Sequence, residues 1–439
     1  MFDALSKKLF FLLFFVAQIA VAQTPITLPE ALKLAQQQNL QLQKQQQAEL
    51  LARLELSIRK AQRLPSLDLS ATSVYTSEIA KFDIPLAITG GRQVQIELGD
   101  HQRSDLALAL RQPLFTGARL QTQVRLAQNA LLSEEIRQEI LQQTIAHQVR
   151  TLFYRAQLLV RERQAQQASL ARVQSALGQA RALMLNAQAM AFDTLKIYTQ
   201  QLQIKIEVEK VAKDQRLLAI HMARLLDLQE ARPIAEQTLQ QPPEAIPALD
   251  SLQHAAMRQR PELRAIQAAQ HAARLQIKLA RSAYFPTLQA EASYNLGKPG
   301  LNQVANEWMD YFAGGVRLQW NLWRGKQDQH RAEQAEITGN RLALEERDLR
   351  QQIRVDVAQA WENLNYVTEQ FDLANQLLLQ QRERYRIANI QYGNGLATTQ
   401  DLTDAETELT QAELLRERIF VQYFLARTDL MLATGTTNY

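Results

Sequence analysis

Residues 353–392 read IRVDVAQAWENLNYVTEQFDLANQLLLQQRERYRIANIQY, and the spacing of their apolar positions decides the fold. These positions follow one another in alternating steps of four and three residues, with one polar break at Gln381. A period of 3.5 residues sustained over this length is typical of a coiled coil, in which the apolar stripe of one helix packs against another. The stripe comprises Val357, Ala360, Leu364, Val367, Phe371, Ala374, Leu378, Tyr385, Ala388 and Tyr392.

The first half of the chain contains a matching stripe with polar breaks at Arg163 and Gln166. It comprises Val149, Leu152, Ala156, Leu159, Leu170, Val173, Leu177, Ala180 and Met184. No proline occurs between Pro113 and Pro233, so the sequence predicts an uninterrupted helix from about 118 to 184. Such a helix of roughly 66 residues is on the order of 100 Å long, far beyond the diameter of a globular domain.

The chain contains one unit twice. At an offset of 221 positions, Ala35 matches Ala256, Leu42 matches Leu263, and Pro65 matches Pro286. At an offset of 208 positions, Phe115 matches Trp323, Asn186 matches Asn394, and Asp193 matches Asp401. Such constant offsets indicate an internal duplication. We predict a first structural repeat at 23–228, a proline-rich connection at 229–248 and a second repeat at 249–439, each running helix, strand, loop, strand, very long helix, turn, helix.

The N-terminus has the features of an export signal. Lys7 and Lys8 precede an apolar run from Leu9 to Ala17, and Ala20-Val21-Ala22 supplies the small residues of a cleavage site. A membrane anchor is the alternative, but the run is shorter than the ~20 apolar residues that a spanning helix needs. We therefore predict a signal peptide at residues 1–22.

Composition excludes several classes of protein. Gly (14) and Pro (12) are few for 439 residues, whereas helix-forming Gln, Leu, Ala and Arg are abundant. The absence of cysteine excludes disulfides, thiol catalysis and a lipid-modified N-terminal cysteine. A net charge of +4 is too small to indicate a nucleic-acid partner.

Each repeat also contains two segments that alternate apolar and polar residues, the pattern of half-exposed strands. The alternating positions are Leu67, Leu69, Ala71, Ser73 and Tyr75; Leu106, Leu108 and Leu110; Leu288, Ala290, Ala292 and Tyr294; and Val316, Leu318 and Trp320. Aromatic residues gather at the strand ends, as interfacial aromatics do in membrane barrels. A soluble sheet packed on helices would alternate in the same way, so the pattern leaves both interpretations open.

The number of strands constrains the assembly. Four strands are too few to close a membrane barrel, since the smallest have about eight. Open edges cannot face lipid, because each unpaired backbone group there costs several kcal/mol. If the strands lie in a membrane, several chains must therefore share one barrel. Two chains would supply eight strands and three would supply twelve, and a twelve-strand barrel is roughly the smallest that leaves a water-filled bore.

Together, the export signal, the duplication and two motifs resemble the TolC family over essentially the whole mature chain. The motifs are QPLFTG at 112–117 and YGNGL at 392–396 followed by Asp401-Leu402. The resemblance implies an outer-membrane channel of a tripartite efflux pump or type I secretion system. The implied fold is mainly α with a β-barrel part, a homotrimer whose twelve-strand barrel continues as a periplasmic coiled-coil barrel. The implied partners are a periplasmic adaptor (membrane fusion) protein and an inner-membrane RND or ABC transporter.

The two helix–helix turns are expected at about 185–194 and 393–402. The resemblance places Asp401 and Asp404 at acidic positions that ring the periplasmic entrance of the pore, where carboxylates attract cations. Thr398 followed by Asp401 is also the pattern of a helix capping box, and one carboxylate can serve both roles.

Tyr392 and Asp193 are the gate candidates. Tyr392 matches the tyrosine that closes the family's pore through hydrogen bonds between neighbouring coils, although as the last member of its stripe it can equally be a core residue. Ala397 stands where family members can carry an arginine, so the ionic link to the position of Asp193 cannot form in that way. Lys196 is an alternative cation, as a partner of Asp404.

The second turn is the expected adaptor contact, through Asn394, Gly395 and Leu396. Gly395 permits the backbone conformation that joins two antiparallel helices, and Leu396 offers an apolar side chain. The first turn differs, with Asn186-Ala187-Gln188 at the equivalent positions. A plain helical-hairpin turn is the alternative for both.

No pattern predicts catalysis, a cofactor or a metal site. The six histidines lack metal-ligand spacing, and no phosphate loop or nucleophile elbow occurs. The alternative function is a periplasmic coiled-coil adaptor or scaffold without a pore, which would not need the strands. For a channel, drugs, metal ions and proteins stay open as cargo, and the lack of Met- or His-rich segments favours general efflux.

Overall fold

The structure is a computed structural model that describes residues 25–85, 93–98, 100–237, 239, 246–302 and 306–436. The predicted signal peptide and part of the predicted connection lie outside these residues. The helices are α2 (Leu28–Gln38), α3 (Leu40–Ala61), α4 (Arg119–Leu185), α5 (Ala191–Leu225), α6 (Leu249–Gln259), α7 (Pro261–Arg281), α8 (Gln327–Gly393) and α9 (Thr399–Thr434), with a 3₁₀ turn η2 (Ser282–Tyr284). The strands are β1 (Ser66–Tyr75), β2 (Ala80–Pro85), β3 (Gln93–Leu98), β4 (Gln102–Phe115), β5 (Thr287–Lys298) and β6 (Met309–Gln319).

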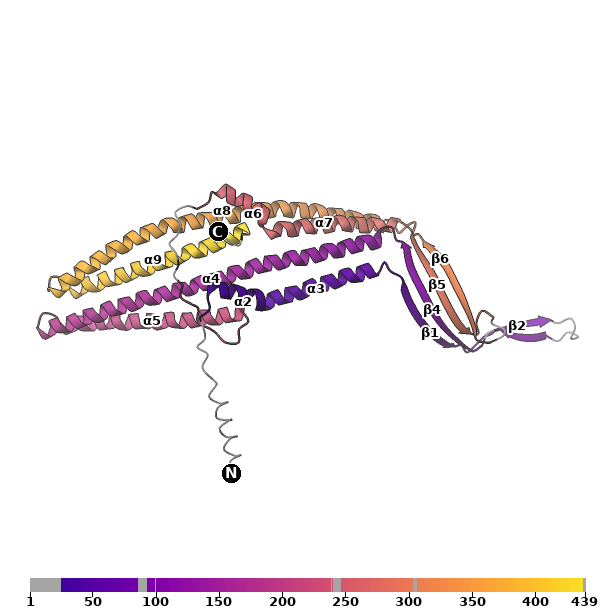
Figure 1. Ribbon diagram of the computed structural model, residues 1–439, viewed down its shortest axis with the longest axis horizontal. Coiled ribbons are helices and arrows are strands. Elements are labelled where there is room, and N and C mark those ends of the chain that lie inside the picture. Colours follow the sequence, from indigo (N-terminus) through magenta and orange to yellow (C-terminus); the bar gives the residue numbers. More distant parts are fainter. Residues whose placement is uncertain are drawn as a thin grey trace, which may run out of the picture. The chain divides into compact units, whose positions relative to one another are not determined.

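The chain forms two compact units. Unit 1 comprises residues 1–46, 136–264 and 347–439, and unit 2 comprises residues 47–135 and 265–346. Each unit contains segments of both predicted repeats, because the long helices α4 and α8 contribute to both. Element order is the same in the two halves of the chain: two helices, paired strands, a long helix and a shorter helix (Figure 1).

The long helices match the prediction closely. Both α4 and α8 contain 67 residues, and α4 begins one residue after the predicted start. Predicted stripe positions such as Val149, Val173, Val357 and Val367 are buried. Coiled-coil spacing therefore identified the packing face as well as the helix.

The single helix predicted at the start of the first repeat is instead two helices, α2 and α3, that meet at Asn39. The Oδ1 atom of Asn39 accepts hydrogen bonds from the backbone N–H groups of Gln41 (2.9 Å) and Leu42 (3.2 Å), which caps the start of α3. The second half breaks at the equivalent place, where Pro261 is the first residue of α7.

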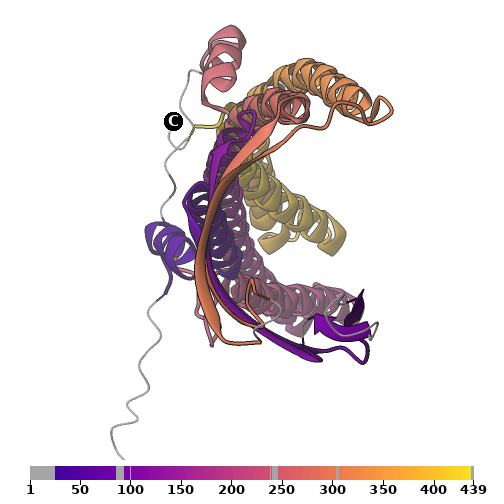
Figure 2. The same ribbon diagram turned by 90° about the vertical axis from the view of Figure 1, so that its right-hand side faces the viewer.

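Unit 2 contains an antiparallel sheet in the order β1-β4-β5-β6, which Figure 2 shows as a curved ribbon. Its register aligns apolar side chains in rows, such as Leu69, Leu108, Tyr294 and Phe312. Because side chains alternate along a strand, the opposite face carries most of the charged residues. The ion pairs on that face include Arg103–Asp105 at 2.7 Å, Arg111–Asp68 at 3.0 Å and Arg317–Glu291 at 3.3 Å.

The prediction of a loop between the two strands of the first repeat is wrong in one respect, because the segment between Tyr75 and Asp105 contains a second small sheet. Strands β2 and β3 pair as an antiparallel hairpin. Residues 93–98 read QVQIEL, an alternating pattern that could have identified β3. The offset between the halves changes from 221 to 208, so the first half has 13 more residues here, and the hairpin lies within this stretch.

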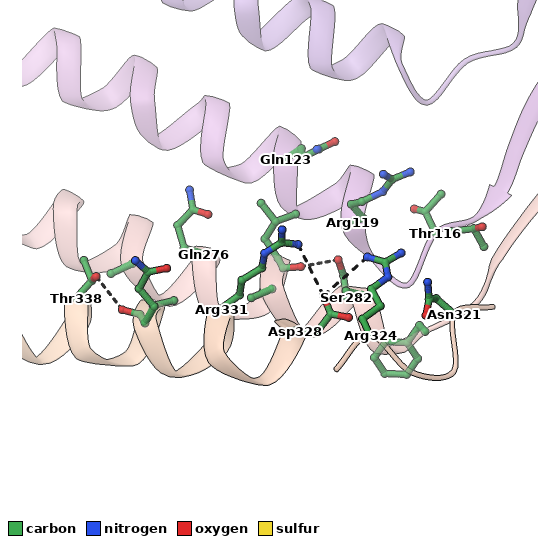
Figure 3. A pocket seen from close by; sticks show the side chains of 18 of the residues that line it. Thr116, Arg119, Gln123, Gln276, Ser282, Asn321, Arg324, Asp328, Arg331 and Thr338 are labelled. Atoms are coloured by element: carbon green, nitrogen blue, oxygen red, sulfur yellow. Dashed lines mark hydrogen bonds and ion pairs between the residues drawn. The ribbon is translucent and has the colours of Figure 1, made fainter. Parts of the chain in front are cut away.

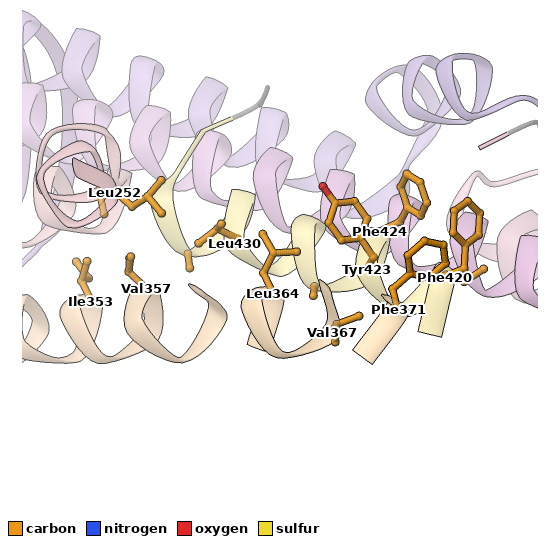
Figure 4. Packing of buried hydrophobic residues seen from close by; sticks show 14 of the residues in the cluster. Leu252, Ile353, Val357, Leu364, Val367, Phe371, Phe420, Tyr423, Phe424 and Leu430 are labelled. Atoms are coloured by element: carbon orange, nitrogen blue, oxygen red, sulfur yellow. The ribbon is translucent and has the colours of Figure 1, made fainter. Parts of the chain in front are cut away.

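The main core of unit 1 lies where α8, α9 and α6 pack together. Figure 4 shows Leu364, Val367 and Phe371 of α8 facing Phe420 and other residues of α9. The rings of Phe371 and Phe420 are 5.5 Å apart. None of the described helices combines the length and apolar composition needed to cross a membrane.

Candidate functional site at the helix–helix turns

The two predicted turns have the same backbone geometry. Residues 186–190 join α4 to α5, and residues 394–398 join α8 to α9, all within unit 1 (Figure 1). The backbone N–H of Leu396 donates to the carbonyl of Gln391 at 2.8 Å, and that of Gln188 donates to the carbonyl of Leu183 at 2.8 Å. These bonds close each helix C-terminus in the manner of a Schellman motif.

A left-handed residue is required in each turn. Gly395 has a φ of +71°, and the equivalent Ala187 has a φ of +56°. Glycine adopts this conformation without a Cβ clash, whereas alanine is strained in it. The left-handed conformation expected of Gly395 is therefore present, and the first turn contains the costlier residue.

Asp401 forms the capping box at the start of α9. Its Oδ2 atom accepts hydrogen bonds from the Thr398 hydroxyl (2.6 Å) and the Thr398 backbone N–H (2.9 Å), and Thr398 Oγ1 accepts one from the Asp401 N–H (3.1 Å). The hydroxyl bond, followed by the backbone bond, holds the pKa of Asp401 below its ordinary value. The capping interpretation is thus confirmed, and the carboxylate remains exposed.

Asp193 caps α5 in a similar way. Its Oδ2 atom accepts a hydrogen bond from the backbone N–H of Met190 at 3.0 Å. No threonine takes part, in agreement with the sequence of the first turn. Both acidic residues therefore stabilise helix N-termini at the tips of their hairpins.

Asp404 lies on the exposed side of α9 and accepts a hydrogen bond from Gln400 Nε2 at 2.6 Å. Lys196 Nζ donates to Gln400 Oε1, so Gln400 stands between the two residues that the sequence suggested as a pair. Asp404 and Lys196 also line a groove of about 420 Å³ between α5 and α9. Its apolar lining residues are Phe192 and Leu195.

Tyr392 is a core residue within the single chain. Its exposed fraction is 3%, and it belongs to a cluster that includes Val173, Ile197 and Leu402. Its hydroxyl accepts a hydrogen bond from Thr399 Oγ1 at 3.4 Å. This cluster packs α4, α5, α8 and α9 together directly beside both turns.

The tips present apolar side chains to solvent. Leu396 is 78% exposed, and Met190 and Phe192 of the first hairpin are exposed as well. Asn186 and Asn394 are exposed at equivalent positions. The tips of both hairpins therefore carry exposed apolar side chains next to polar ones.

A charged network behind the turns was missed by the sequence analysis. Arg172 of α4 contacts Glu413 at 2.9 Å and Glu406 at 3.3 Å, both on α9. Glu406, only 3% exposed, also accepts hydrogen bonds from Ser169 Oγ (2.7 Å) and Gln200 Nε2 (3.0 Å). A signal existed, since Glu406 occupies a stripe position between Leu402 and Leu409 in steps of four and three. Polar residues at such positions specify register.

Comparison with known families gives one match. The family model described as "Outer membrane efflux protein" matches residues 31–187 and 252–436, which cover both halves of the chain. Among curated proteins, none matches the chain.

Several solved structures are similar in fold. VceC, an outer membrane protein of Vibrio cholerae, superimposes with a TM-score of 0.75 at 15% identity, over 93% of this chain and 96% of that one. The Campylobacter jejuni CmeC outer membrane channel gives 0.77 at 14% identity, over 93% and 85%. CusC, whose crystal structures concern conformational changes during folding and transmembrane channel formation, superimposes with a TM-score of 0.79 at 15% identity, over 94% of this chain and 93% of that one. At these identities the likeness shows the fold.

Proposed function

The chain belongs to the outer membrane efflux protein family, and from this premise we propose that it is the passive exit channel of a tripartite efflux pump or type I secretion system. It is located in the outer membrane and extends into the periplasm. An inner-membrane transporter of the RND or ABC class supplies the energy, and a periplasmic adaptor joins the two. The repeats at 23–228 and 249–439 each supply one strand pair and one long helical hairpin.

One observation carries this proposal: unit 2 exposes apolar stripes on two helices that are connected to its edge strands. Strands β1 and β6 are the edges of the four-stranded sheet. Helix α3 leads into β1, and helix α8 follows β6. The exposed stripe on α3 contains Leu51, Leu54 and Ile58, and that on α8 contains Ile337 and Leu344. Their spacings of three, four and seven residues are those of coiled-coil contacts.

Three copies arranged in a ring would pair all the open sheet edges and bury all the exposed apolar stripes. In a closed ring, β6 of one copy pairs with β1 of the next, and the stripe on α8 packs against that on α3. Such head-to-tail contacts leave no open edge, as a barrel in lipid requires. The result is a twelve-strand barrel, about the size at which a water-filled bore appears.

The apolar face of the sheet is suited to lipid contact. Its exposed residues are Leu67, Leu69, Leu106, Leu108, Leu110, Tyr294, Phe312, Val316 and Leu318. Exposed Tyr75 at one end of β1, with Trp320 and Trp323 beyond β6, matches the aromatic girdles of membrane barrels. The charged face then lines the bore.

At the periplasmic end, Asp401 and Asp404 form the acidic entrance in this proposal. Three chains bring their carboxylates around one opening, where the summed field favours cations. Asp401 performs its capping role at the same time. Tyr392 and Asp193 act as gate residues: Tyr392 packs beside the turn that must move, and Asp193 caps the neighbouring hairpin.

The exposed turns are the proposed adaptor contact. Leu396 supplies the apolar anchor at the second turn, flanked by Asn394 and Gly395, and Asn186 with Met190 offers a corresponding surface at the first. Equivalent backbone geometry at both turns supports engagement of both, through different side chains.

Planar-bilayer conductance of the detergent-purified protein tests the channel and its entrance. We expect ion-conducting steps with cation selectivity, and Asp404→Asn should lower the cation-over-anion permeability ratio roughly twofold without disturbing the cap. Asp214→Asn on α5 is the charge-matched control. Unchanged selectivity in Asp404→Asn would remove Asp404 from the entrance. Absence of conductance, with protein soluble without detergent, would favour a coiled-coil scaffold instead.

A further inference from the structure

A pocket of about 770 Å³ lies in unit 2, where the sheet meets the helices. Its volume falls within the range of sites that hold drug-sized molecules. Figure 3 shows Arg119 and Gln123 of α4 on one side and Asp328, Arg331 and Thr338 of α8 on the other. Ser282 and Gln276 line it between the helices.

The pocket has an excess of positive charge. It contains Arg119, Arg324 and Arg331 against a single carboxylate, Asp328. Asp328 Oδ1 is 3.9 Å from Arg324 Nη1 and 3.8 Å from Arg331 Nη1, too far for hydrogen bonds. That oxygen is buried and has no hydrogen-bond partner among the described residues. Asp328 therefore attracts the two guanidinium groups without saturating their N–H donors.

Arg119 is the third cation and is exposed to the pocket. Across the described ranges, its side chain has no ion pair or hydrogen bond. A guanidinium group is a planar donor that binds carboxylate, sulfonate or phosphate groups in a bidentate manner. Arg119 and Arg331 together thus offer free donors to an anionic group.

The pocket also has an apolar wall. Leu279, Ala280, Ala283, Phe285 and Ala335 line it alongside the charged residues. A small inorganic anion would leave this wall uncovered, whereas an organic anion would cover it and satisfy the guanidinium groups at once.

The strand residues that line the pocket belong to the polar face of the sheet. Thr287 of β5 and Gln319 of β6 line it and pair with each other across the strands. By alternation they share a face with Glu291 and Arg317, opposite Leu288 and Leu318. In a membrane barrel that polar face is turned to the bore.

We propose that this pocket is a binding site for drug-sized organic anions inside the channel, with Arg119 and Arg331 holding the anionic group. The location in the bore rests on the proposed function, whereas the binding chemistry rests on unit 2 alone. A trimer would contain three such sites around the bore, next to the barrel sheet. Cargo with a carboxylate or sulfonate group would bind there transiently during export.

Titration calorimetry of the full-length protein in a neutral maltoside detergent tests the site, with 1-naphthalenesulfonate as probe. We expect saturable binding to the wild type, at least fivefold weaker binding to Arg119→Gln and no detectable binding to Arg119→Gln/Arg331→Gln. Arg317→Gln, which removes the same charge on the same face outside the pocket, should bind as the wild type does. Unchanged affinity in the double variant would overturn the proposal.

Two further probes define the ligand class. The cation 1-naphthylmethylammonium should not bind, and inorganic phosphate should compete only weakly. Equal binding of the cation would mean that the apolar wall alone acts, and full competition by phosphate would mean a small-anion site; either result overturns the proposal. Because calorimetry does not require conduction, sulfonate binding by a protein without conductance would keep the site and refute the channel.

Discussion

The two turns differ in the residue type at their left-handed position. Gly395 and Ala187 both have positive φ, and their turns close with matching hydrogen bonds. No heavy atom lies within 4 Å of a Cβ built on Gly395, so a substitution there would meet only backbone strain. Because the surrounding hydrogen bonds are equivalent, comparing the two turns isolates the free-energy cost of placing alanine in the left-handed conformation.

Exchanging these residues should change stability in opposite directions. We expect Gly395→Ala to lower the free energy of unfolding by about 1 kcal/mol, because alanine is strained at positive φ. Ala187→Gly should raise it by about 0.5 kcal/mol, since relief of strain exceeds the entropic cost of glycine. Denaturant titration followed by circular dichroism measures both, and a loss of stability in Ala187→Gly would contradict the argument.

The cap of α9 should depend on pH. Because the Thr398 hydrogen bonds lower the pKa of Asp401 in the folded state, its contribution to stability is present above the ordinary pKa of 3.8. That contribution is lost as the pH falls through the lower folded-state pKa. Hydrogen exchange of the amides at 398–402, corrected for intrinsic rates, should show this loss of protection.

Asp401→Asn supplies the control for the titration. Its asparagine cannot ionise, so protection at 398–402 should be lower than in the wild type at neutral pH and should not change on acidification. A parallel fall in protection in both proteins would assign the pH effect to another group.

At the scale of the elements, α4 and α9 are joined by charge as well as by apolar contacts. Arg172 is held between Glu406 and Glu413, with its guanidinium 5.8 Å from the Tyr385 ring of α8. The Arg172 and Glu406 side chains are 18% and 5% exposed, so water screens them poorly. Removal of one partner would leave an uncompensated charge in the bundle.

Arg172→Met should therefore be strongly destabilising. We expect the free energy of unfolding to fall by about 2–3 kcal/mol, mainly because Glu406 and Glu413 lose their cation. Arg384→Met, which breaks the exposed ion pair between Arg384 and Glu408, should cost less than about 0.5 kcal/mol. Equal losses in the two variants, measured by denaturant titration, would show that the buried network adds nothing beyond a surface pair.

At the scale of the whole molecule, the exposed apolar stripes on α3 and α8 are the features that favour assembly into a trimer. A single chain leaves both sheet edges open and leaves Leu51 and Leu54 of α3 and Ile337 and Leu344 of α8 in solvent. Burial of each such side chain contributes roughly 1.5–3 kcal/mol, and a closed trimer buries every copy. Assembly is therefore expected to be strong and sensitive to charge on the stripes.

Leu344→Asp should disrupt the trimer. An unpaired carboxylate would have to be desolvated at the contact with α3 of the next copy, which opposes association. Ala343→Asp introduces the same charge on the adjacent exposed residue, off the stripe, and should leave the trimer intact. Native mass spectrometry of detergent-purified protein distinguishes the two, and an intact Leu344→Asp trimer would remove this stripe from the interface.

Local and periodic features could be predicted from the sequence because each depends on residues close together in the chain. The 3.5-residue spacing gave both long helices and their buried faces, and Thr398 with Asp401 predicted the capping box. The break at Asn39 and the β2–β3 hairpin also had local signals, in an Asn side chain suited to capping and in the alternation at 93–98. The duplication predicted the equivalence of the two turns.

Only the tertiary structure decided which distant residues meet. The network of Arg172 with Glu406 and Glu413 joins positions more than 230 residues apart. The pocket gathers arginines from α4 and from the start of α8, and the interposition of Gln400 between Lys196 and Asp404 depends on the packing of α5 against α9. Helix phase and strand alternation determine which face of an element is apolar, but the rotation and register of one element against another are set by side-chain packing across the whole chain.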